Sequence, residues 1–470
     1  MKKLKKVTAF VLCMTMALSM TACGSSASQP AAPETEAAEV AATEAAATEA
    51  AATEAAEEGE NAAEPAGEVS GTLEIQYFVG GYGSAWWEWL VDGFKQKYPD
   101  VEIVVNSGSD INETMNTRWI SNNPPDMIYL DGPSVSETTY VEDELLMDLT
   151  DWYQGLTLEN GEKLSENFLV QPNNYDGQIY ALPIIYDNRC VWYDSAEFEK
   201  NSWDVPADYD SWMASMQAIK TATGKAPLGS TGVYPSVFMK GVLYPAFADE
   251  GGKELLMSLI DGEEGAWSSE GTLNVMKKIQ AIVDAGLIDP NFAGETHTES
   301  QMSFLQHDNY YVATGFWLPN EMKGSIPDDF VFGMTPTPMN KAGQAACTIP
   351  DIKTVGIAKN AKNPDAAKAL LEYMFSEESA VKMAELAGTS LNLKNIDYSA
   401  SDAVPEYLLA ATEMLSDSSR CDIVSIDHAM STDLQNPIGD IINLLLMGEI
   451  NAEEFCEQAE VIAADYRNNQ

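Results

Sequence analysis

Residues that could contact a ligand gather where short β-rich stretches of this sequence end. Gly81 and Tyr82 follow the stretch 72–78, and Asp131 follows the stretch 126–130. Aromatic rings offer flat apolar faces, whereas carboxylates form strong directed hydrogen bonds with hydroxyl groups. A glycine beside an aromatic residue also lets the backbone approach a ligand closely. These residue types suit a ligand that has both apolar C–H faces and many hydroxyls.

The sequence around these residues predicts alternating strands and helices. Three β-rich stretches are separated by two stretches whose apolar residues recur every three or four positions. In order they are 72–78, 85–98, 101–105, 112–120 and 126–130. This order predicts a parallel sheet with helices on its faces, and such sheets bind ligands at the carboxyl ends of their strands. We expect the loop 80–83 and Asp131 at two such ends.

The predicted helix 85–98 carries the adjacent residues Trp86 and Trp87. Adjacent helical positions point in different directions, so we expect one ring in the core and the other in the ligand cleft. Trp86 is the candidate for the cleft.

The composition excludes several functions. The formal net charge is −47, from 73 acidic and 26 basic residues. Nucleic-acid binding requires basic patches, and adsorption to anionic lipid requires clustered cations, so neither partner is expected. An acidic, solvated surface is the simpler interpretation. The chain is long enough to favour two domains rather than a single core.

The cysteines and histidines give no sign of a metal or cofactor site. The histidines show no metal-ligand spacing, and the cysteines that follow position 23 have no C-x-x-C spacing. These residues are His297, His307, His428, Cys190, Cys347, Cys421 and Cys456. Four cysteines allow three disulfide connectivities, and the sequence does not choose among them. We expect no metal and no cofactor.

The N-terminus predicts export and attachment to a membrane. Four lysines precede a short apolar run, which is typical of a cleaved signal peptide over 1–22. The ending LSMTAC, followed by GSS, resembles a bacterial lipobox with Cys23 as the lipidated residue. Residues 23–70 consist mostly of Ala, Glu and Thr without Lys or Arg, which predicts a disordered tether. We therefore expect a bacterial lipoprotein at the extracellular face of the cell membrane, held by its lipid alone.

Five segments of the remaining chain carry a distinctive order of motifs. They are 175–183 (YDGQIYALP), 191–194 (VWYD), 203–212 (WDVPADYDSW), 310–317 (YYVATGFW) and 354–374 (TVGIAKNAKNPDAAKALLEYM). Together they resemble the carbohydrate-binding proteins of ABC importers, a family of extracellular solute-binding proteins related to the maltose-binding protein. The chain departs from the family pattern at Tyr193-Asp194, where Tyr-Asn is usual, and at Ser211-Trp212, where Thr-Trp is commoner. The loop VGGYG at 79–83 is similar to the branch that takes amino sugars or chito-oligosaccharides.

This resemblance implies an α/β fold with two lobes of the periplasmic-binding-protein type (type II-like), each a mostly parallel sheet flanked by helices. The implied N-terminal lobe comprises 71–185 with about 356–410, and the C-terminal lobe comprises 186–355 with about 411–470. The chain would cross between lobes near 185–187 and 353–355, and again in a later helical region. Hinge bending would close the lobes on a ligand.

The resemblance also implies a function and further site residues. The protein would be a monomer that captures a sugar or oligosaccharide and delivers it to the permease subunits of an ABC transporter. Trp317 matches the stacking tryptophan of the family's Gly-x-Trp element. The further ligand-binding candidates are Asp187, Asn188, Tyr244 and Asp351, beside Gly81, Tyr82, Trp86 and Asp131.

Two other functions remain open. The first is a binding protein for a non-sugar solute such as a peptide or polyamine. The second is a secreted glycoside hydrolase, which would need two carboxylates across a sugar bond; the resemblance points to a binding protein rather than an enzyme. The sequence identifies neither the sugar, its length and linkage, nor the affinity and the permease.

Overall fold

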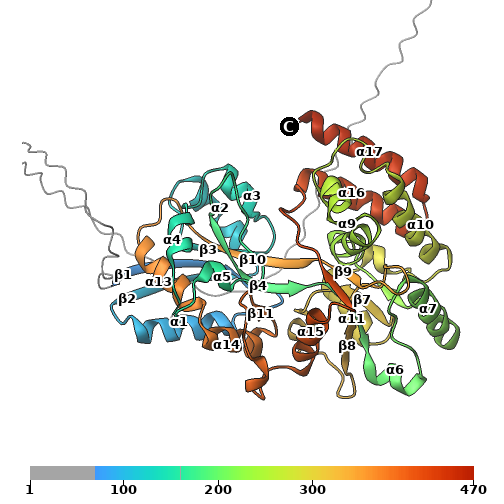
Figure 1. Ribbon diagram of the computed structural model, residues 1–470, viewed down its shortest axis with the longest axis horizontal. Coiled ribbons are helices and arrows are strands. Elements are labelled where there is room, and N and C mark those ends of the chain that lie inside the picture. The colour runs from blue at the N-terminus through green and yellow to red at the C-terminus, as the bar shows by residue number, and fades with distance from the viewer. Residues whose placement is uncertain (1–68, 159, 470) are drawn as a thin grey trace, which may run out of the picture. The chain divides into compact units, whose positions relative to one another are not determined.

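The computed structural model describes residues 69–158 and 160–469 (Figure 1). The predicted signal peptide, the lipid-anchor residue Cys23 and nearly all of the tether lie outside these residues. In the part of the chain that is described, no helix is both long and apolar enough to cross a membrane.

Three sheets form the framework. The first has six strands in the order β11-β4-β10-β3-β1-β2, the second has four in the order β6-β7-β5-β8, and the third pairs β12 with β9 (Figure 1). The first comprises β1 (Gly71–Phe78), β2 (Val101–Gly108), β3 (Met127–Leu130), β4 (Ala181–Asn188), β10 (Pro350–Ile357) and β11 (Ser390–Leu391). The others comprise β5 (Cys190–Asp194), β6 (Leu228–Gly229), β7 (Tyr311–Thr314), β8 (Phe332–Thr335), β9 (Ala346–Thr348) and β12 (Cys421–Ile423).

The strand pairing is mixed rather than mostly parallel. β1 pairs in parallel with β2 and β3, as the local alternation predicts. β10 is antiparallel to β3 and β4, and β11 is antiparallel to β4. In the second sheet only β6 and β7 are parallel. The expectation fails beyond the first three strands because the later ones return from distant parts of the chain, which local periodicity does not reveal.

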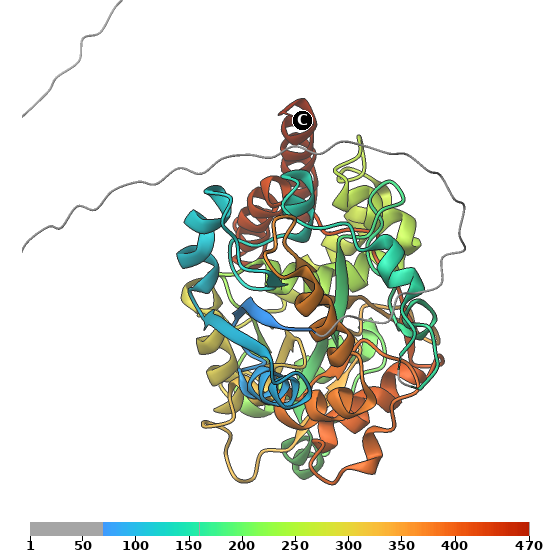
Figure 2. The same cartoon turned by 90° about the vertical axis from the view of Figure 1, so that its left-hand side faces the viewer.

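Helices cover both faces of the first sheet because the buried residues of β3 alternate between two cores. Met127 and Tyr129 contact the core that contains residues of α1 (Ala85–Lys97), whereas Ile128 and Leu130 contact α2 (Ile111–Ile120). On the α1 side, α13 (Pro364–Met374) and α14 (Glu377–Ala387) pack against α1, as Figure 2 shows.

The remaining helices lie along the chain as follows. They are α3 (Glu137–Glu142), α4 (Thr150–Gly155), α5 (Leu164–Asn167), α6 (Ser195–Asn201), α7 (Tyr209–Thr223), α8 (Ser236–Phe238), α9 (Tyr244–Ile260), α10 (Glu270–Asp284), α11 (His297–Leu305), α12 (Leu318–Glu321), α15 (Glu406–Ser416), α16 (Thr432–Leu446) and α17 (Ala452–Asn469). A π-helical turn spans Met239–Leu243, and 3-10 turns span Phe292–Gly294 and Tyr398–Ala400.

The chain passes from the first sheet to the second, and from the third sheet back to the first, through very short links. Arg189 alone separates β4 from β5, and Ile349 alone separates β9 from β10. Because β4 and β10 pair side by side, with Asp187 opposite Asp351, both passages lie at the same place. They fall within a few residues of the predicted crossings.

Three of the hydrophobic cores are each built from different parts of the chain. One is built mainly from 73–185 and 355–393, and another from 191–349 and 430–463. Residues 398–414 pack in a third with Trp192 and Phe304, so the predicted division at about 410 falls inside one cluster. Ile396 contacts two of these cores and marks a third passage of the chain.

Candidate functional site

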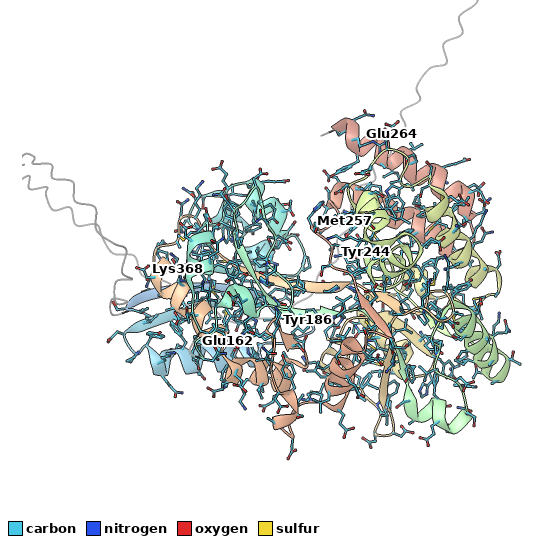
Figure 3. All side chains as sticks on the ribbon, viewed as in Figure 1. Glu162, Tyr186, Tyr244, Met257, Glu264 and Lys368 are labelled. Atoms are coloured by element: carbon cyan, nitrogen blue, oxygen red, sulfur yellow. The ribbon has the colours of Figure 1, made fainter. Side chains whose placement is uncertain are left out.

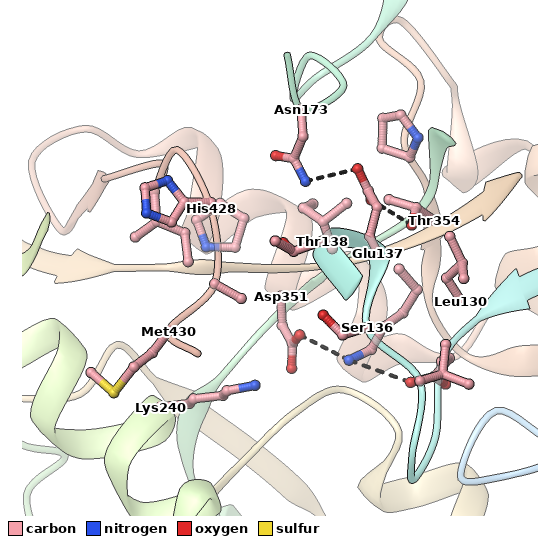
Figure 4. Close-up of a pocket in the computed structure, with 18 of the residues that line it drawn as sticks. Leu130, Ser136, Glu137, Thr138, Asn173, Lys240, Asp351, Thr354, His428 and Met430 are labelled. Atoms are coloured by element: carbon pink, nitrogen blue, oxygen red, sulfur yellow. Dashed lines mark hydrogen bonds and ion pairs between the residues drawn. The ribbon is translucent and has the colours of Figure 1, made fainter. Parts of the chain in front are cut away.

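A cavity of about 560 Å³ lies where the two chain passages meet (Figure 4). Its floor is formed by Arg189 and 349–354. One wall comes from 130–138 and 170–173, and the opposite wall comes from the α8–α9 region and the loop before α16. Strand ends of the first sheet and helices of the second thus surround one space.

Ion pairs tie the floor of this cavity together. Arg189 Nη2 donates to Asp351 Oδ2 at 2.7 Å, and Lys353 Nζ lies 2.9 Å from Asp351 Oδ1 and 3.6 Å from Asp131 Oδ1. Burial alone would raise the pKa of Asp351, but the neighbouring Lys353 and Arg189 hold it well below its usual range. Burial alone would lower the pKa of Lys353, and Asp351 with Asp131 raises it instead. The floor therefore carries fixed charges.

The wall opposite Asp131 is built on an unusual turn. Tyr244 follows the π-helical turn Met239–Leu243, and such turns often mark functional positions. Lys240 from this turn points into the cavity beside Asp351 (Figure 4), and Tyr244 starts α9 (Figure 3). Burial lowers the pKa of Lys240 to about 8.

Hydrogen bonds from three uncharged donors hold Glu137, which lies on α3 in the wall formed by 130–138. The Glu137 carboxylate accepts from Asn173 Nδ2 at 3.1 Å, from Tyr175 Oη at 3.2 Å and from Thr354 Oγ1 at 2.7 Å. Burial raises the pKa of Glu137, and these hydrogen bonds oppose the rise. The network joins α3 to β10, and two of its bonds are drawn in Figure 4.

Several buried polar atoms around the cavity have no partner. Among the described residues, no hydrogen bond reaches Tyr244 Oη, Arg189 Nε, Arg189 Nη1 or Asn188 Nδ2. A buried donor without a partner costs about 1–3 kcal/mol, so native proteins rarely leave several together unless water or a ligand satisfies them. Arg189 and Tyr244 line the cavity, and Asn188 precedes Arg189 at the end of β4, so these atoms indicate a site for a ligand rich in hydrogen-bonding groups.

A second cluster lies behind the floor. The hydroxyl of Tyr82 donates to Asp187 Oδ2, and the backbone N–H of Phe316 donates to Asp187 Oδ1 at 2.8 Å. Asn320 Nδ2 donates to the carbonyl of Gly81 at 2.8 Å. Burial raises the pKa of Asp187 to about 7. The loop after β1 is thereby fastened to the segment after β7.

Trp317 sits at the centre of this second cluster. The Tyr82 ring meets its indole edge-on at 6.1 Å, and the Arg189 guanidinium covers its face at 4.7 Å. Its indole N–H donates to His297 Nε2 at 3.0 Å. Burial lowers the pKa of His297 to about 4, so the imidazole stays neutral and can accept this bond. Arg189 therefore lies between Trp317 and the cavity.

The nine predicted ligand-binding residues divide into three groups. Asp131, Tyr244 and Asp351 line the cavity directly. The cluster behind the floor brings together Gly81, Tyr82, Asp187 and Trp317, and Asn188 lies buried at the end of β4. Trp86 lies in the core beside Trp87, and its indole donates to the carbonyl of Ser379 at 3.1 Å. The expectation that one of the two rings faces the cleft is not met, because α14 covers that side of α1.

Sequence reasoning missed three charged residues of the cavity, namely Arg189, Lys240 and Lys353. Each had a local signal. Arg189 follows Asp187-Asn188 in an otherwise apolar stretch, Lys240 is a single cation in an apolar stretch, and Lys353 lies within a strand. Charged residues are almost never buried without a purpose or a partner.

The other reactive groups do not form a site. In the described part of the chain, no group of His, Cys, Asp and Glu side chains is arranged to hold a metal ion. Cys190, Cys347, Cys421 and Cys456 are buried free thiols, which answers the pairing question that the sequence left open.

Comparison with known proteins places the chain among binding proteins. It is 26% identical over 352 residues to the diacetylchitobiose binding protein NgcE of Streptomyces coelicolor, covering 70% of this chain and 73% of that protein. It is 17% identical over 314 residues to the multiple sugar-binding protein of Streptococcus mutans, covering 65% and 72% of the two.

Solved structures show the same fold. A chitin oligosaccharide binding protein matches with a TM-score of 0.67 at 18% identity, covering 84% of this chain and 98% of that one. The GacH receptor of Streptomyces glaucescens matches with a TM-score of 0.66 at 19% identity, covering 85% and 98%. The fold is thus the two-lobed α/β fold of periplasmic binding proteins, as predicted. The family of bacterial extracellular solute-binding proteins matches residues 79–381, and the chain belongs to that family.

Proposed function

We propose that this protein is the substrate-binding component of an ABC importer, which captures a sugar or oligosaccharide and delivers it to membrane permease subunits. The observation that carries the proposal is that two cavity-lining residues, Arg189 and Tyr244, have buried polar atoms without a hydrogen-bond partner among the described residues. A sugar supplies many hydroxyls at short spacing, so it can satisfy several such atoms at once.

The relatives support a carbohydrate ligand. NgcE is named for diacetylchitobiose, and the Streptococcus mutans relative is named for multiple sugars. Structural neighbours include RafE in complex with raffinose and a Listeria monocytogenes protein in complex with cycloalternan. The shared fold places no constraint on the particular sugar, which depends on the residues of this chain's own cavity.

The proposed contacts follow from the geometry. Asp131, Asp351 and Tyr244 would bond sugar hydroxyls directly, and Arg189 would add its remaining N–H groups. Gly81, Tyr82, Asp187 and Asn188 would hold the loop after β1 and the end of β4 in place. Trp317 would offer its ring once Arg189 moves aside. Trp86 is left out of the proposed site because it is buried in the core.

Closure of two lobes is the proposed mechanism. The predicted lobes, 71–185 with about 356–410 and 186–355 with about 411–470, would hinge at the links Arg189 and Ile349. A ligand that contacts both walls binds the closed form better and shifts the population toward it. The permease would then recognise the closed protein.

The proposed location is the outer face of a bacterial membrane. Cys23 would carry the lipid, and the stretch 23–70 would tether a monomeric binding unit at a distance from the bilayer. Stable anchoring of this kind requires more than one acyl chain.

The alternative functions would require different chemistry in the cavity. A glycoside hydrolase needs a carboxylate free to exchange protons, whereas Asp131 and Asp351 are both held in ion pairs with Lys353. A peptide or polyamine ligand remains an alternative that only binding experiments separate from a sugar.

Thermal-shift screening of the purified full-length protein tests the proposal. The panel should hold neutral, amino and acidic sugars as mono- and oligosaccharides, with peptides and polyamines as controls. A ligand that binds only the folded state raises the melting temperature in a dose-dependent way. A shift with sugars supports the proposal, whereas shifts with peptides or polyamines alone would overturn it.

A further inference from the structure

The cavity is lined by three cationic and three acidic side chains, but not every cation forms an ion pair. Three side chains are cationic, namely Arg189, Lys240 and Lys353. The first and third pair with Asp351 and Asp131, which leaves both carboxylates fully engaged. Among the described residues, Lys240 forms neither a hydrogen bond nor an ion pair. Lys240 therefore lies near Asp351 (Figure 4) without forming a direct ion pair with it.

Lys240 is a half-buried cation in this cavity. Desolvation is the main cause of its lowered pKa of about 8; attraction by Asp351 opposes the lowering, and Arg189 and Lys353 add repulsion. A buried charge without a partner normally shifts its pKa or acquires a counter-ion. With a pKa near 8, Lys240 still carries its proton for most of the time at neutral pH.

Arg189 offers further donors in the same space. One arm of its guanidinium binds Asp351, while Nε and Nη1 are buried without partners. The side chain is 10% exposed and lines the cavity. A guanidinium presents its donors in a planar fork that matches the two oxygens of a carboxylate.

The other ionisable groups around the cavity do not neutralise Lys240. The carboxylate oxygens of Glu137 are occupied by three neutral donors from Asn173, Tyr175 and Thr354. His428 hydrogen-bonds Asp261 at 2.6 Å. Among the described residues, Lys240 is therefore a cavity cation without a direct ionic contact.

We propose that the sugar bound in this cavity carries a carboxylate, as a hexuronic acid residue does, and that Lys240 and Arg189 bind it. This inference rests on the proposed function, because it names the class of sugar. Ser136, Thr138 and Ser236 line the same cavity and are suited to the ring hydroxyls. The carboxylate would lie between the α8–α9 wall and the floor, so that one ligand group contacts both sides of the cavity.

The test compares sugars that differ only in this group. Glucuronate and galacturonate, as monosaccharides and disaccharides, should be titrated calorimetrically into the full-length protein beside the matching uronamides and neutral hexoses. We expect the acids to bind about tenfold or more tighter than their neutral counterparts, because a desolvated charge pair replaces a neutral contact.

The variant Lys240→Met removes the charge of Lys240 and keeps the length of the side chain. It should weaken uronate binding about tenfold or more, and more than it weakens the binding of neutral sugars. Its melting temperature without ligand should equal or exceed that of the parent protein, because an unpaired buried charge is lost. Lys200→Met is the matched control, since Lys200 is 71% exposed on α6 and pairs with Glu197.

Each outcome bears on the inference in a defined way. Preferential binding of uronates that Lys240→Met abolishes would support it. Binding of neutral sugars only, or uronate binding that Lys240→Met leaves unchanged, would overturn it and leave the proposed function intact. If no sugar binds but a peptide or polyamine clearly does, the proposed function and this inference are both overturned.

Discussion

At the scale of single residues, Arg189 links all parts of the site. It is the one residue between β4 and β5, it pairs with Asp351, and its guanidinium covers Trp317. Its Nε and Nη1 atoms are buried and have no hydrogen-bond partner among the described residues. A movement of this side chain would therefore change the cavity floor and the exposure of Trp317 together.

Close packing of Gly81 against Trp317 gives the first prediction. A Cβ at position 81 would lie 2.8 Å from Cβ of Trp317, which is closer than real Cβ atoms approach. Gly81→Ala should lower the free energy of unfolding by about 1–3 kcal/mol, because the loop after β1 must move away. Urea unfolding of the full-length protein measures this change.

Gly155→Ala is the control for that substitution. Gly155 ends α4, and nothing lies within 4 Å of a Cβ built there. An alanine at position 155 should leave stability unchanged or raise it slightly. Equal effects of the two substitutions would show that the contact between Gly81 and Trp317 does not form.

Residues at the ends of strands could be predicted from the sequence, whereas residues whose partners are distant along the chain could not. Tyr82 and Asp131 follow strands directly, so local patterning reveals their position. Arg189 and Lys240 were missed because their surroundings are made by distant segments. The partner of Arg189, Asp351, is 162 positions away along the chain. Trp86 was misplaced because helical periodicity shows which faces are apolar but not that Trp86 packs against α14.

At the scale of elements, a buried carboxylate fastens α9 to β9, one residue before the passage at Ile349. Asp249 Oδ1 accepts the backbone N–H of Cys347 at 2.8 Å, while Oδ2 is buried without a partner among the described residues. Burial raises the pKa of Asp249 to about 7. The folded protein therefore favours the protonated form, and ionisation of Asp249 destabilises it.

The second prediction concerns Asp249→Asn, which keeps the acceptor oxygen and removes the charge. The folded pKa lies above the unfolded value of 3.8, so the destabilisation is absent below about pH 4 and complete above pH 7. The variant should match the parent protein near pH 4 and be more stable by about 1–3 kcal/mol at pH 8. Urea unfolding at pH 4, 6 and 8 measures the difference, and a pH-independent difference would contradict it.

The elements themselves were partly predictable. The order β1-α1-β2-α2-β3 follows from alternating apolar patterns within 71–130, and the boundaries agree closely with the structure. The insertion of β10 between β3 and β4 was not predictable, since β10 starts at Pro350 and its pairing depends on closure of a long loop. The resemblance to known binding proteins, rather than periodicity, supplied the two-lobed fold.

At the scale of the whole molecule, the contact between the loop 80–83 and the segment 315–320 belongs to the closed form in our account. It consists of the Asn320–Gly81 hydrogen bond and the Tyr82–Trp317 ring contact. The third prediction is that Asn320→Ala populates more open forms. Because only the closed form binds fully, the apparent affinity for the sugar should fall about two- to tenfold.

Small-angle scattering measures this opening. The ligand-free Asn320→Ala variant should have a larger radius of gyration than the parent protein, and saturating ligand should bring the two together. Asn201→Ala is the control, because Asn201 bonds only to Glu197 within α6. Identical scattering and affinity of parent and Asn320→Ala would refute the proposed role of this contact in closure.

The most direct test of the central claim is calorimetric titration of the parent protein and Tyr244→Phe with the sugar that gives the largest thermal shift. The substitution removes only a hydroxyl that is buried at the cavity without a partner. We expect unchanged or slightly higher stability without ligand and an affinity about five- to thirtyfold lower. Tyr209→Phe, whose hydroxyl bonds the carbonyl of Lys278 at 2.9 Å, is the control and should bind like the parent. Equal affinity of Tyr244→Phe and the parent protein would contradict the claim that this cavity holds the sugar.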